Sequence, residues 1–366
     1  MAAPLTVIKL GSSVVADDGG VLRRDGLAAL CGTVADARHD GRRFVVVSSG
    51  AIARGVEALG LPARPVSIDG LQAASAVGQG RLFREWDDLF AAHGVLAAQV
   101  LLTLYDLGDR EAFVNARATL TRLLAYDAIP VINENDTTTT DEISFGDNDL
   151  LAAQVAIMLG ASRLVLLTST DGLFTADPTS DPDARLVAEV TDPARALTDH
   201  DVGTTTSSLG TGGMRSKVLA AEMAAAAGIS TVVASGLRPD ALRRVVAGEP
   251  EGTRFVAGEP RFSSFKLWLR YAKPAQGTIV VDDGAARALT VRETSLLPVG
   301  VVAVTGDFKV GDAVEIACDG RTLGKGISGY ASGGLRRVMG ERTDRVRELL
   351  PQSPAEAIHR DRLVLY

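Results

Sequence analysis

The chain has 366 residues, with 38 basic and 45 acidic side chains and a formal net charge of −7 at pH 7. At ~150 residues per domain this length predicts about two domains, and the acidic balance excludes a protein that coats nucleic acid over its whole surface. Apolar residues make up 46% of the chain and charged residues 23%, which excludes disorder as the main state. Cys31 and Cys318 stand too far apart for a metal or redox spacing, so we expect a reduced, cytoplasmic setting.

Two features of the sequence bear on membranes. The segment Met1–Val7 has no charged region ahead of its apolar residues, so we expect no secretory signal. The longest apolar runs, such as 152–161, are interrupted by Gln or Gly and fall short of the ~20 residues needed to span a bilayer. We therefore expect a soluble intracellular protein.

Residues 5 to about 256 alternate between apolar, β-branched segments and amphipathic helical segments. The expected strands cover Thr6–Leu10, Phe44–Val47, Val95–Leu101, Ile129–Ile132, Arg163–Thr168 and Thr231–Ala234. The expected helices cover Arg23–Arg38, Leu71–Ala92, Arg110–Tyr126, Asp149–Leu159 and Met214–Ala227. This alternation is typical of an α/β domain in which helices sandwich a mostly parallel sheet.

The pattern changes near residues 257–260. Beyond them, short strands separated by Gly and Asp turns are expected at Gly277–Val281, Val299–Thr305, Ala313–Cys318 and Leu323–Tyr330. Such spacing predicts a small β-rich domain. We therefore expect a first domain over 1–258, a small domain over 275–352 and a tail over 353–366.

Lysine is rare in the first domain. Lys9 and Lys217 are the two lysines of the first 265 residues, and Arg supplies the other side chains of permanent positive charge. A lysine in a chain that otherwise uses Arg suggests a site that needs a compact point charge rather than a planar guanidinium. Survival of two lysines by chance is the alternative explanation.

Three segments suit a bound anion. Lys9-Leu10-Gly11-Ser12-Ser13 follows the first strand, at the edge where open α/β sheets bind ligands. Ser48-Ser49-Gly50-Ala51-Ile52 follows the second strand and places hydroxyl and N–H groups at a helix start, although capping alone would explain one serine. Gly210-Thr211-Gly212-Gly213-Met214-Arg215-Ser216-Lys217 opens another helix, with neither the Walker A order nor the position of a dinucleotide-binding loop.

Carboxylates and amides gather in Asn133-Glu134-Asn135-Asp136 and Gly146-Asp147-Asn148-Asp149. Such groups suit a substrate with an ammonium group, or would help to hold Mg²⁺ through water. A polar surface loop in which Asp149 caps a helix is the alternative. The stretch 168–178 is typical of a strand end followed by a hairpin-like excursion, which we interpret as a lid or wall for a nucleotide base. The four histidines are scattered, which gives no support to zinc or His-based triads.

These groups together indicate phosphoryl transfer without a protein nucleophile. Lys9 and Lys217 would stabilise the transferring group from opposite sides, and Asp149 would hold their ammonium groups in place. Mg²⁺ would bridge the nucleotide phosphates. With no general base in view, the expected acceptor is an ionised carboxylate or phosphate.

At these motifs the chain resembles the amino acid kinase family, and over nearly its whole length it is similar to those members that act on glutamate and carry a C-terminal PUA domain. The resemblance implies transfer of the γ-phosphoryl of ATP to the side-chain carboxylate of L-glutamate, giving L-glutamyl 5-phosphate and opening proline biosynthesis. It also implies a homo-oligomer, either a dimer or a tetramer. Feedback inhibition by L-proline is common in the family.

The resemblance assigns most of the site residues by position, while Gly11, Ser12 and Gly50 are expected from the anion-binding segments themselves. It implies a catalytic set of Lys9, Lys217 and Asp149. The residues expected to contact ATP are Lys9, Gly11, Ser12, Thr168, Ser169, Thr211, Gly212, Gly213, Met214, Arg215, Ser216 and Lys217. Ser169 stands where the family often has Asp. Ser49, Gly50, Asp136 and Asn148 are expected to contact glutamate, and no residue is assigned to a metal.

Two other functions compete with this interpretation. An RNA-binding protein is one, because PUA domains elsewhere bind RNA; the ten basic and ten acidic residues of 275–352 do not favour it, although Arg336 and Arg337 offer a local patch. A kinase acting on acetylglutamate or aspartate is the other. Asp136, if placed for a free ammonium group as in the family, argues against the acetylated acceptor.

Overall fold

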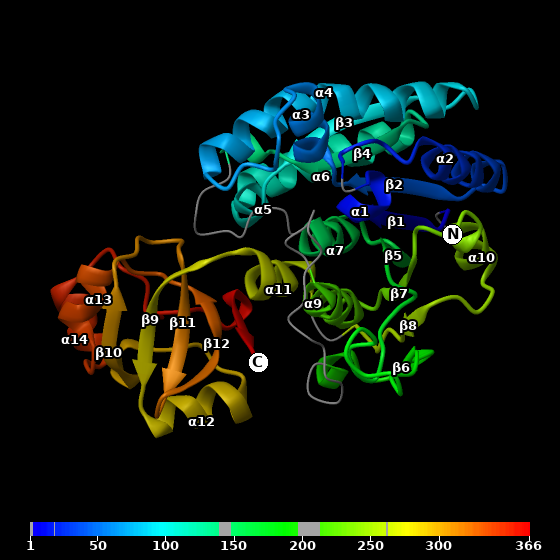
Figure 1. The fold of residues 1–366 in the computed structure, drawn as a ribbon. Coiled ribbons are helices and arrows are strands. Elements are labelled where there is room, and N and C mark those ends of the chain that lie inside the picture. The colour runs from blue at the N-terminus through cyan, green and yellow to red at the C-terminus, as the bar shows by residue number, and fades with distance from the viewer. Residues whose placement is uncertain (1–2, 18, 139–147, 197–212, 261–262) are drawn as a thin grey trace. The chain divides into compact units, whose positions relative to one another are not determined.

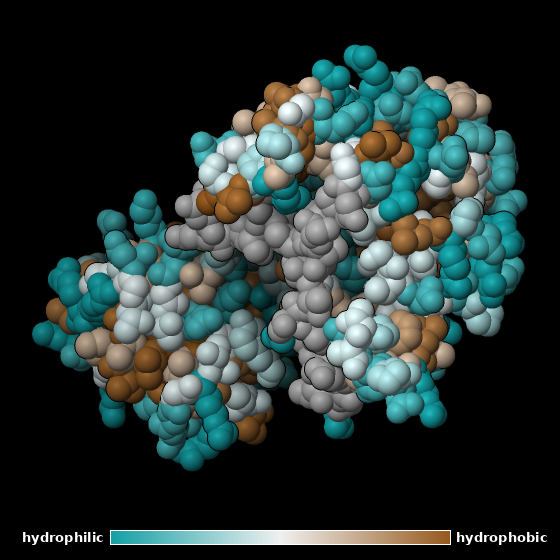
Figure 2. Space-filling view, viewed as in Figure 1, coloured by the Kyte–Doolittle hydropathy of each residue, from teal (hydrophilic) through white to brown (hydrophobic). Residues whose placement is uncertain are grey.

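The computed structural model describes residues 3–17, 19–138, 148–196, 213–260 and 263–366. The chain forms two compact units, Met1–Arg261 and Phe262–Tyr366, and each contains its own sheet (Figure 1). Within the described ranges every helix is too short or too polar to span a bilayer. The face of the molecule in Figure 2 is mostly hydrophilic, with apolar side chains in separate areas.

The larger unit is built on an eight-stranded sheet with the spatial order β3-β4-β2-β1-β5-β7-β8-β6. Neighbouring strands are parallel, except for the antiparallel pair of β7 and β8. The strands are β1 (Leu5–Leu10), β2 (Arg43–Ser48), β3 (Ala97–Leu102), β4 (Ile129–Glu134), β5 (Arg163–Thr168), β6 (Glu189–Val190), β7 (Ser230–Ser235) and β8 (Thr253–Phe255). Central strands such as β2 and β5 are nearly continuous apolar runs because both of their faces are buried.

Helices cover both faces of this sheet (Figure 1). One set packs over β4, β1, β5 and β7 and consists of α6 (Arg110–Ala125), α7 (Asn148–Leu159) and α9 (Met214–Ala226). The other set consists of α2 (Arg24–His39), α4 (Ile68–Ala91) and α10 (Ala241–Ala247). Shorter helices are α1 (Ser12–Val15), α3 (Ala51–Ala58) and α5 (Leu104–Gly108). The α2 and α4 face contains an apolar core that includes Phe44, Trp86 and Phe90.

The smaller unit contains a five-stranded sheet with the order β10-β9-β11-β12-β13. Its strands are β9 (Ala275–Val281), β10 (Val301–Gly306), β11 (Ala313–Cys318), β12 (Arg321–Ile327) and β13 (Leu363–Leu365). The β9–β11 pair is parallel and the other pairs are antiparallel. Its helices are α11 (Ser264–Leu267), α12 (Asp283–Arg292), α13 (Ser332–Val338) and α14 (Thr343–Leu349). Its own core includes Phe308, Ile316 and Leu335.

The predicted architecture, a helix-covered and mostly parallel sheet followed by a small β-rich unit, is confirmed. The six strands expected in the first part correspond to β1 to β5 and β7, and the four expected in the second part to β9 to β12. The patterns did not predict β6, β8, α10 or β13, each of seven residues or fewer, and they predicted none of the helices of the smaller unit, of which α12 has ten residues. Strand β13 pairs with β12, so the C-terminal segment belongs to the second sheet.

Candidate active site

The carboxyl ends of β4, β2, β1 and β5, which are adjacent in the sheet, bring the sequence motifs together. Backbone hydrogen bonds join the segments that follow β1 and β2 to the last residues of the neighbouring strands. The Gly11 N–H donates to the Leu167 carbonyl at 3.0 Å, and the Ser49 N–H donates to the Leu10 carbonyl at 3.2 Å. Motifs that are far apart in sequence therefore lie side by side, at the edge where open parallel sheets bind ligands.

Strand β1 directs Lys9 toward helix α7. Its neighbours Ile8 and Leu10 belong to the core on the α2 and α4 face, and successive side chains of a strand point to opposite faces. Lys9 Nζ lies 2.6 Å from Oδ1 of Asp149, which stands in the first turn of α7. Both side chains are buried, with exposed fractions of 6% and 0%.

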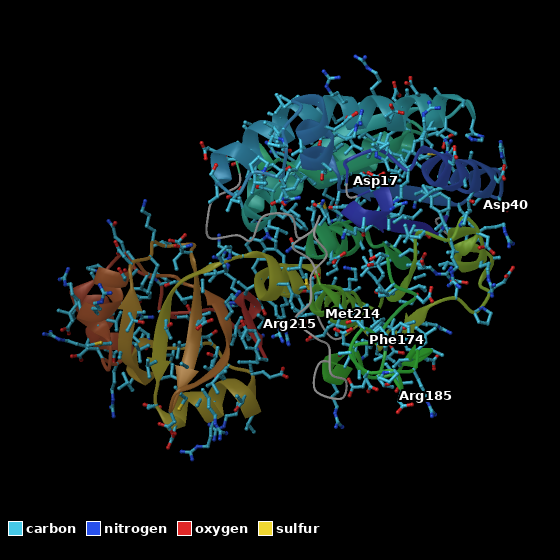
Figure 3. The ribbon with its side chains drawn as sticks, in the orientation of Figure 1. Asp17, Asp40, Phe174, Arg185, Met214 and Arg215 are labelled. Carbon is cyan, nitrogen blue, oxygen red and sulfur yellow. The ribbon has the colours of Figure 1, made fainter. Side chains whose placement is uncertain are left out.

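A second lysine binds the other oxygen of the same carboxylate. Lys217 Nζ lies 3.0 Å from Asp149 Oδ2, and the Ser216 hydroxyl lies 2.8 Å from that oxygen. Both residues belong to the first turns of α9, which begins at Met214 (labelled in Figure 3). We call Lys9, Asp149 and Lys217 the buried trio. Two ammonium groups against one carboxylate leave the trio with a net positive charge.

The lysines keep Asp149 ionised. Burial by itself raises the pKa of this carboxyl, but the charges of Lys9 and Lys217 and the Ser216 hydrogen bond outweigh burial and hold the pKa well below its usual range. Asp149 is therefore ionised at neutral pH. A fixed positive surplus in a site that excludes water suits the phosphates of a nucleotide.

A group of amide side chains lies next to the trio, because Asn148 begins α7. The Asn148 amide nitrogen donates to the Ser49 hydroxyl at 2.9 Å, to the Asn133 side-chain oxygen at 3.1 Å and to the Ser48 carbonyl at 3.3 Å. Asn133 in turn donates to Oε1 of Gln79 on α4 at 2.6 Å. The ends of β2 and β4 and the start of α7 are thus joined by one network of hydrogen bonds.

Asp136, just after β4, is a buried carboxylate that the Ser75 hydroxyl of α4 contacts as a donor. Burial raises the pKa of Asp136, and the Ser75 hydrogen bond and the positive charge of Arg64 partly oppose this rise. In the same way, burial lowers the pKa of Arg64, and Asp136 opposes that change. A carboxylate that is shielded from solvent is well suited to bind a cation that has N–H donors.

Helix α4 reaches this edge because it crosses α3 with backbone against backbone. A Cβ atom at Gly78 would lie 1.9 Å from the Ala51 carbonyl oxygen, so glycine alone fits there. Ser75 and Gln79 stand one helical turn apart on α4 and flank this crossing. The crossing therefore sets the position of both polar side chains.

The chain after β5 turns back on itself. Phe174 and Leu186 form an antiparallel bridge, and Phe174 and Arg185 are labelled in Figure 3. The excursion starts at Thr168, which is buried, and Ser169, which is exposed. Its hairpin-like form agrees with the sequence pattern, and its contact with a nucleotide base stays a prediction.

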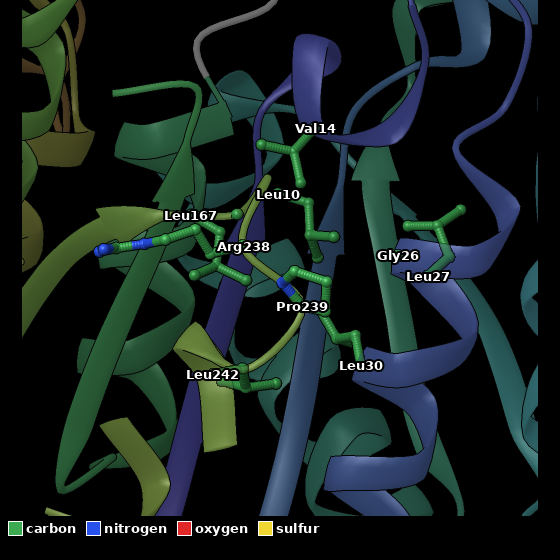
Figure 4. A pocket seen from close by; sticks show the side chains of 10 residues that line it. Leu10, Val14, Gly26, Leu27, Leu30, Leu167, Arg238, Pro239 and Leu242 are labelled. Atoms are coloured by element: carbon green, nitrogen blue, oxygen red, sulfur yellow. The ribbon is translucent and has the colours of Figure 1, made fainter. Parts of the chain in front are cut away.

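A small pocket opens on the α2 face of the same edge (Figure 4). It is lined mainly by Leu10, Val14, Leu27, Leu30, Leu167 and Leu242. The charged side chain at this pocket is Arg238, which pairs with Glu251. Because Lys9 and Leu10 are successive residues of β1 and point to opposite faces, this apolar pocket is separate from the buried trio.

The structure brings several of the predicted site residues together. Lys9, Asp149 and Lys217 form the trio, and Ser49 and Asn148 share a hydrogen bond. The others described are spread along the same edge or at the start of α9: Gly11, Ser12, Gly50, Asp136, Thr168, Ser169, Gly213, Met214, Arg215 and Ser216. Thr211 and Gly212 lie outside the described residues.

Sequence reasoning missed Ser75, Gln79 and Arg64. The first two lie inside a predicted helix, and their four-residue spacing was the available signal. Arg64 precedes α4, in a segment without a motif. None of the three carries chemistry that is recognisable before the fold places it beside Asp136 or Asn133.

Known proteins are similar to this chain over almost its whole length. The profile of the amino acid kinase family matches residues 4–235, and that of the PUA domain matches residues 277–350. The glutamate 5-kinase of Burkholderia thailandensis is 45% identical over 361 residues, which are 98% of this chain and 97% of that protein. The glutamate 5-kinase of Laribacter hongkongensis is 45% identical over 360 residues, 98% of this chain and 96% of that protein. A solved structure of isopentenyl phosphate kinase is 18% identical and covers 69% of this chain and 100% of its own, with a TM-score of 0.49.

Proposed function

The chain belongs to the amino acid kinase family, within the group of the glutamate 5-kinases, and from this premise we propose that it transfers the γ-phosphoryl group of ATP to the side-chain carboxylate of L-glutamate. The product is L-glutamyl 5-phosphate, and its formation opens proline biosynthesis. The observation that supports this proposal most is the buried trio, in which the two lysines of the first 265 residues bind one carboxylate.

In the proposed reaction an oxygen of the glutamate side chain attacks the γ-phosphorus. The bond from that phosphorus to the β–γ bridging oxygen breaks, and ADP leaves. The acceptor is already ionised, so no proton has to be removed. Lys9 and Lys217 stabilise charge on the transferring and leaving oxygens, and Asp149 holds both ammonium groups in place beforehand.

The amide group and Asp136 form the glutamate side of the proposed site. Asp136 is the buried carboxylate for the α-ammonium group, and Asn148 lies beside the Ser49 hydroxyl. Gly50 precedes α3 with a φ of +108°, and a Cβ atom there would lie 2.8 Å from Val15. The N–H groups at the start of α3 suit the α-carboxylate of the substrate.

ATP is proposed to bind along the segments that follow β1 and β5 and the segment that opens α9. The residues assigned to it are Lys9, Gly11, Ser12, Thr168, Ser169 and 211–217. ATP would be supplied as its Mg²⁺ complex, in which the metal would neutralise part of the phosphate charge. Asp149 is not assigned to the metal, because both of its oxygens are already bound by lysine. In the described part of the chain, the group of metal-ligand side chains is Asp283, Cys318 and Asp319, in the smaller unit.

Further assignments rest on the likeness to the family. They are a homo-oligomeric state, dimer or tetramer, and feedback inhibition by L-proline. A cytoplasmic location is supported by the use of ATP and by two buried free thiols, Cys31 and Cys318. The proposed division is a kinase domain over 1–258 and a PUA-like domain over 275–352, and the profile matches at 4–235 and 277–350 support it. The segment 353–366, expected as a tail, contributes β13 to the sheet of the smaller unit.

A panel of acceptors tests the choice of substrate. ADP release would be measured with Mg²⁺ and ATP and, in turn, L-glutamate, N-acetyl-L-glutamate and L-aspartate, against a blank without acceptor. We expect kcat/KM to be about 100-fold higher for L-glutamate than for N-acetyl-L-glutamate, because a site built to bind an ammonium group rejects an acceptor without one. L-Aspartate has the ammonium group but a side chain one methylene shorter, so its carboxylate falls short of the γ-phosphorus and its kcat/KM should be about 10-fold lower or more. Faster release with N-acetyl-L-glutamate would overturn the substrate assignment and leave the phosphoryl transfer intact.

A further inference from the structure

Asn148 holds a buried polar atom to which the described part of the chain offers no hydrogen bond. The residue is 3% exposed, and its amide nitrogen donates to three acceptors at the ends of β2 and β4. Its side-chain oxygen Oδ1 is buried and has no hydrogen-bond partner among the described residues. Buried polar atoms are seldom left unpaired, so this oxygen points to a ligand that donates a hydrogen bond.

The orientation of the Asn148 amide is fixed by a chain of acceptors. The Ser48 main-chain carbonyl can only accept, so the Asn148 nitrogen must face it. Asn133 then has to present its oxygen to Asn148, which turns its own nitrogen toward α4. Gln79 Oε1 accepts from that nitrogen at 2.6 Å. This orientation of the two asparagine amides, with each nitrogen facing an acceptor, therefore requires a hydrogen-bond acceptor at position 79.

We propose that Gln79 is a positioning residue that sets the orientation of the Asn133 and Asn148 amides. As a result, Asn148 offers its side-chain oxygen, and not its amide nitrogen, to the substrate. The inference rests on the proposed function and deepens it. The ligand group that meets Asn148 must be a donor, as the α-ammonium group of a free amino acid is. Asp136 is positioned by Ser75, one turn before Gln79 on α4, so one helix prepares both acceptors for the same cation.

Loss of the acceptor at position 79 has a defined consequence. The buried Asn133 nitrogen is then unpaired, which is costly. If Asn133 rotates to relieve this, its nitrogen faces the Asn148 nitrogen, and Asn148 has to rotate as well. That second rotation gives up the bond to Ser48 and places an N–H donor where the substrate's ammonium group also donates. Affinity for the amino acid falls, while the buried trio is not touched.

Three variants of Gln79 separate the effect of its hydrogen-bond acceptor from a general disturbance of α4. Gln79→Met keeps the length and removes the acceptor, Gln79→Lys offers donors only, and Gln79→Glu keeps an acceptor. Gln99→Met makes the same chemical change at an exposed position of the edge strand β3 and serves as the control. The readouts are KM for L-glutamate, KM for ATP, kcat, and the inhibition constant of glutarate, which lacks the ammonium group.

We expect the KM for L-glutamate to rise about tenfold or more in Gln79→Met and Gln79→Lys and to stay within about threefold of wild type in Gln79→Glu. The KM for ATP and the glutarate constant should stay within about twofold in all three. A KM for L-glutamate that is unchanged in Gln79→Lys, or a glutarate constant that rises in parallel, would overturn the proposal. A wild-type protein that does not phosphorylate L-glutamate would instead overturn the proposed function.

Discussion

Lys9 and Asp149 form an ion pair of 2.6 Å in which both side chains are buried. The pair joins the carboxyl end of β1 to the first turn of α7, and Lys217 of α9 shares the same carboxylate. One aspartate thus fixes two cations from distant parts of the chain before any substrate arrives. Such preorganised charge is the largest contribution that a protein makes to phosphoryl transfer.

Replacing Lys217 with arginine should abolish most of the activity although the charge is retained. The ammonium group of Lys217 lies 3.0 Å from Asp149 in a buried place, and the larger planar guanidinium cannot occupy the same point. We expect kcat to fall about 100-fold or more, as for the loss of one stabilising donor. Lys309→Arg, the same change at an exposed position of the smaller unit, is the control. Near-normal turnover of Lys217→Arg would refute the need for a point charge.

Asp149→Asn should destabilise the protein as well as inactivate it. The change leaves two buried ammonium groups without their carboxylate, and breaking a buried pair in this way costs about 3–5 kcal/mol. The free energy of unfolding, from urea titration at pH 7, measures the effect. Asp127→Asn removes an exposed partner of Arg38 and should cost less than about 1 kcal/mol. Equal losses in the two variants would contradict the assignment of a buried trio.

The stability of the wild type should also report on Asp149 through pH. Its pKa in the folded protein is depressed by the lysines, so its contribution is present above the unfolded pKa of about 4. The contribution is lost as the pH falls from there toward the folded pKa. The difference in unfolding free energy between wild type and Asp149→Asn should therefore shrink below about pH 4. A constant difference would show that the charge of Asp149 is not what stabilises the site.

Ser75→Ala should move the acid limb of the pH profile to higher pH. The Ser75 hydrogen bond lowers the pKa of Asp136, a carboxyl whose pKa burial raises. Without that bond the pKa rises further, so Asp136 takes up a proton, and loses the substrate's ammonium group, at a higher pH. The profile of kcat/KM for L-glutamate between about pH 4 and pH 8 measures this. A folded variant with an unmoved acid limb would separate Asp136 from ammonium binding.

Two glycines of α4 test how closely this helix packs against α3, because Gly78 lies in the contact and Gly80 lies outside it. A Cβ atom at Gly78 would lie 1.9 Å from a carbonyl oxygen of α3, whereas nothing lies within 4 Å of one at Gly80. We expect Gly78→Ala to lower the free energy of unfolding by about 3 kcal/mol, because the backbones must separate. Gly80→Ala should raise it by about 0.5–1 kcal/mol, since alanine favours the helix. Comparable stabilities of the two variants would show that the crossing is not tight.

The sequence was enough to predict those parts of the fold whose pattern is local. Strands such as β2 and β5 are apolar runs, and the rarity of lysine singled out Lys9 and Lys217. By contrast, β6 has two residues and β13 has three, too few for any periodicity to appear. Gln79 was missed because its role depends on the crossing of α3 and α4 at Gly78. That contact is tertiary and leaves no mark on the helical pattern.

Trapping with hydroxylamine tests most directly that the protein phosphorylates a carboxylate and that the buried trio is needed for this reaction. With ATP, Mg²⁺, L-glutamate and hydroxylamine, the wild-type protein should form the glutamyl hydroxamate in proportion to the ADP released, and Lys217→Arg should form almost none. Added L-proline in the same assay reports on feedback inhibition. ADP release without hydroxamate, or equal hydroxamate from the two proteins, would contradict the account.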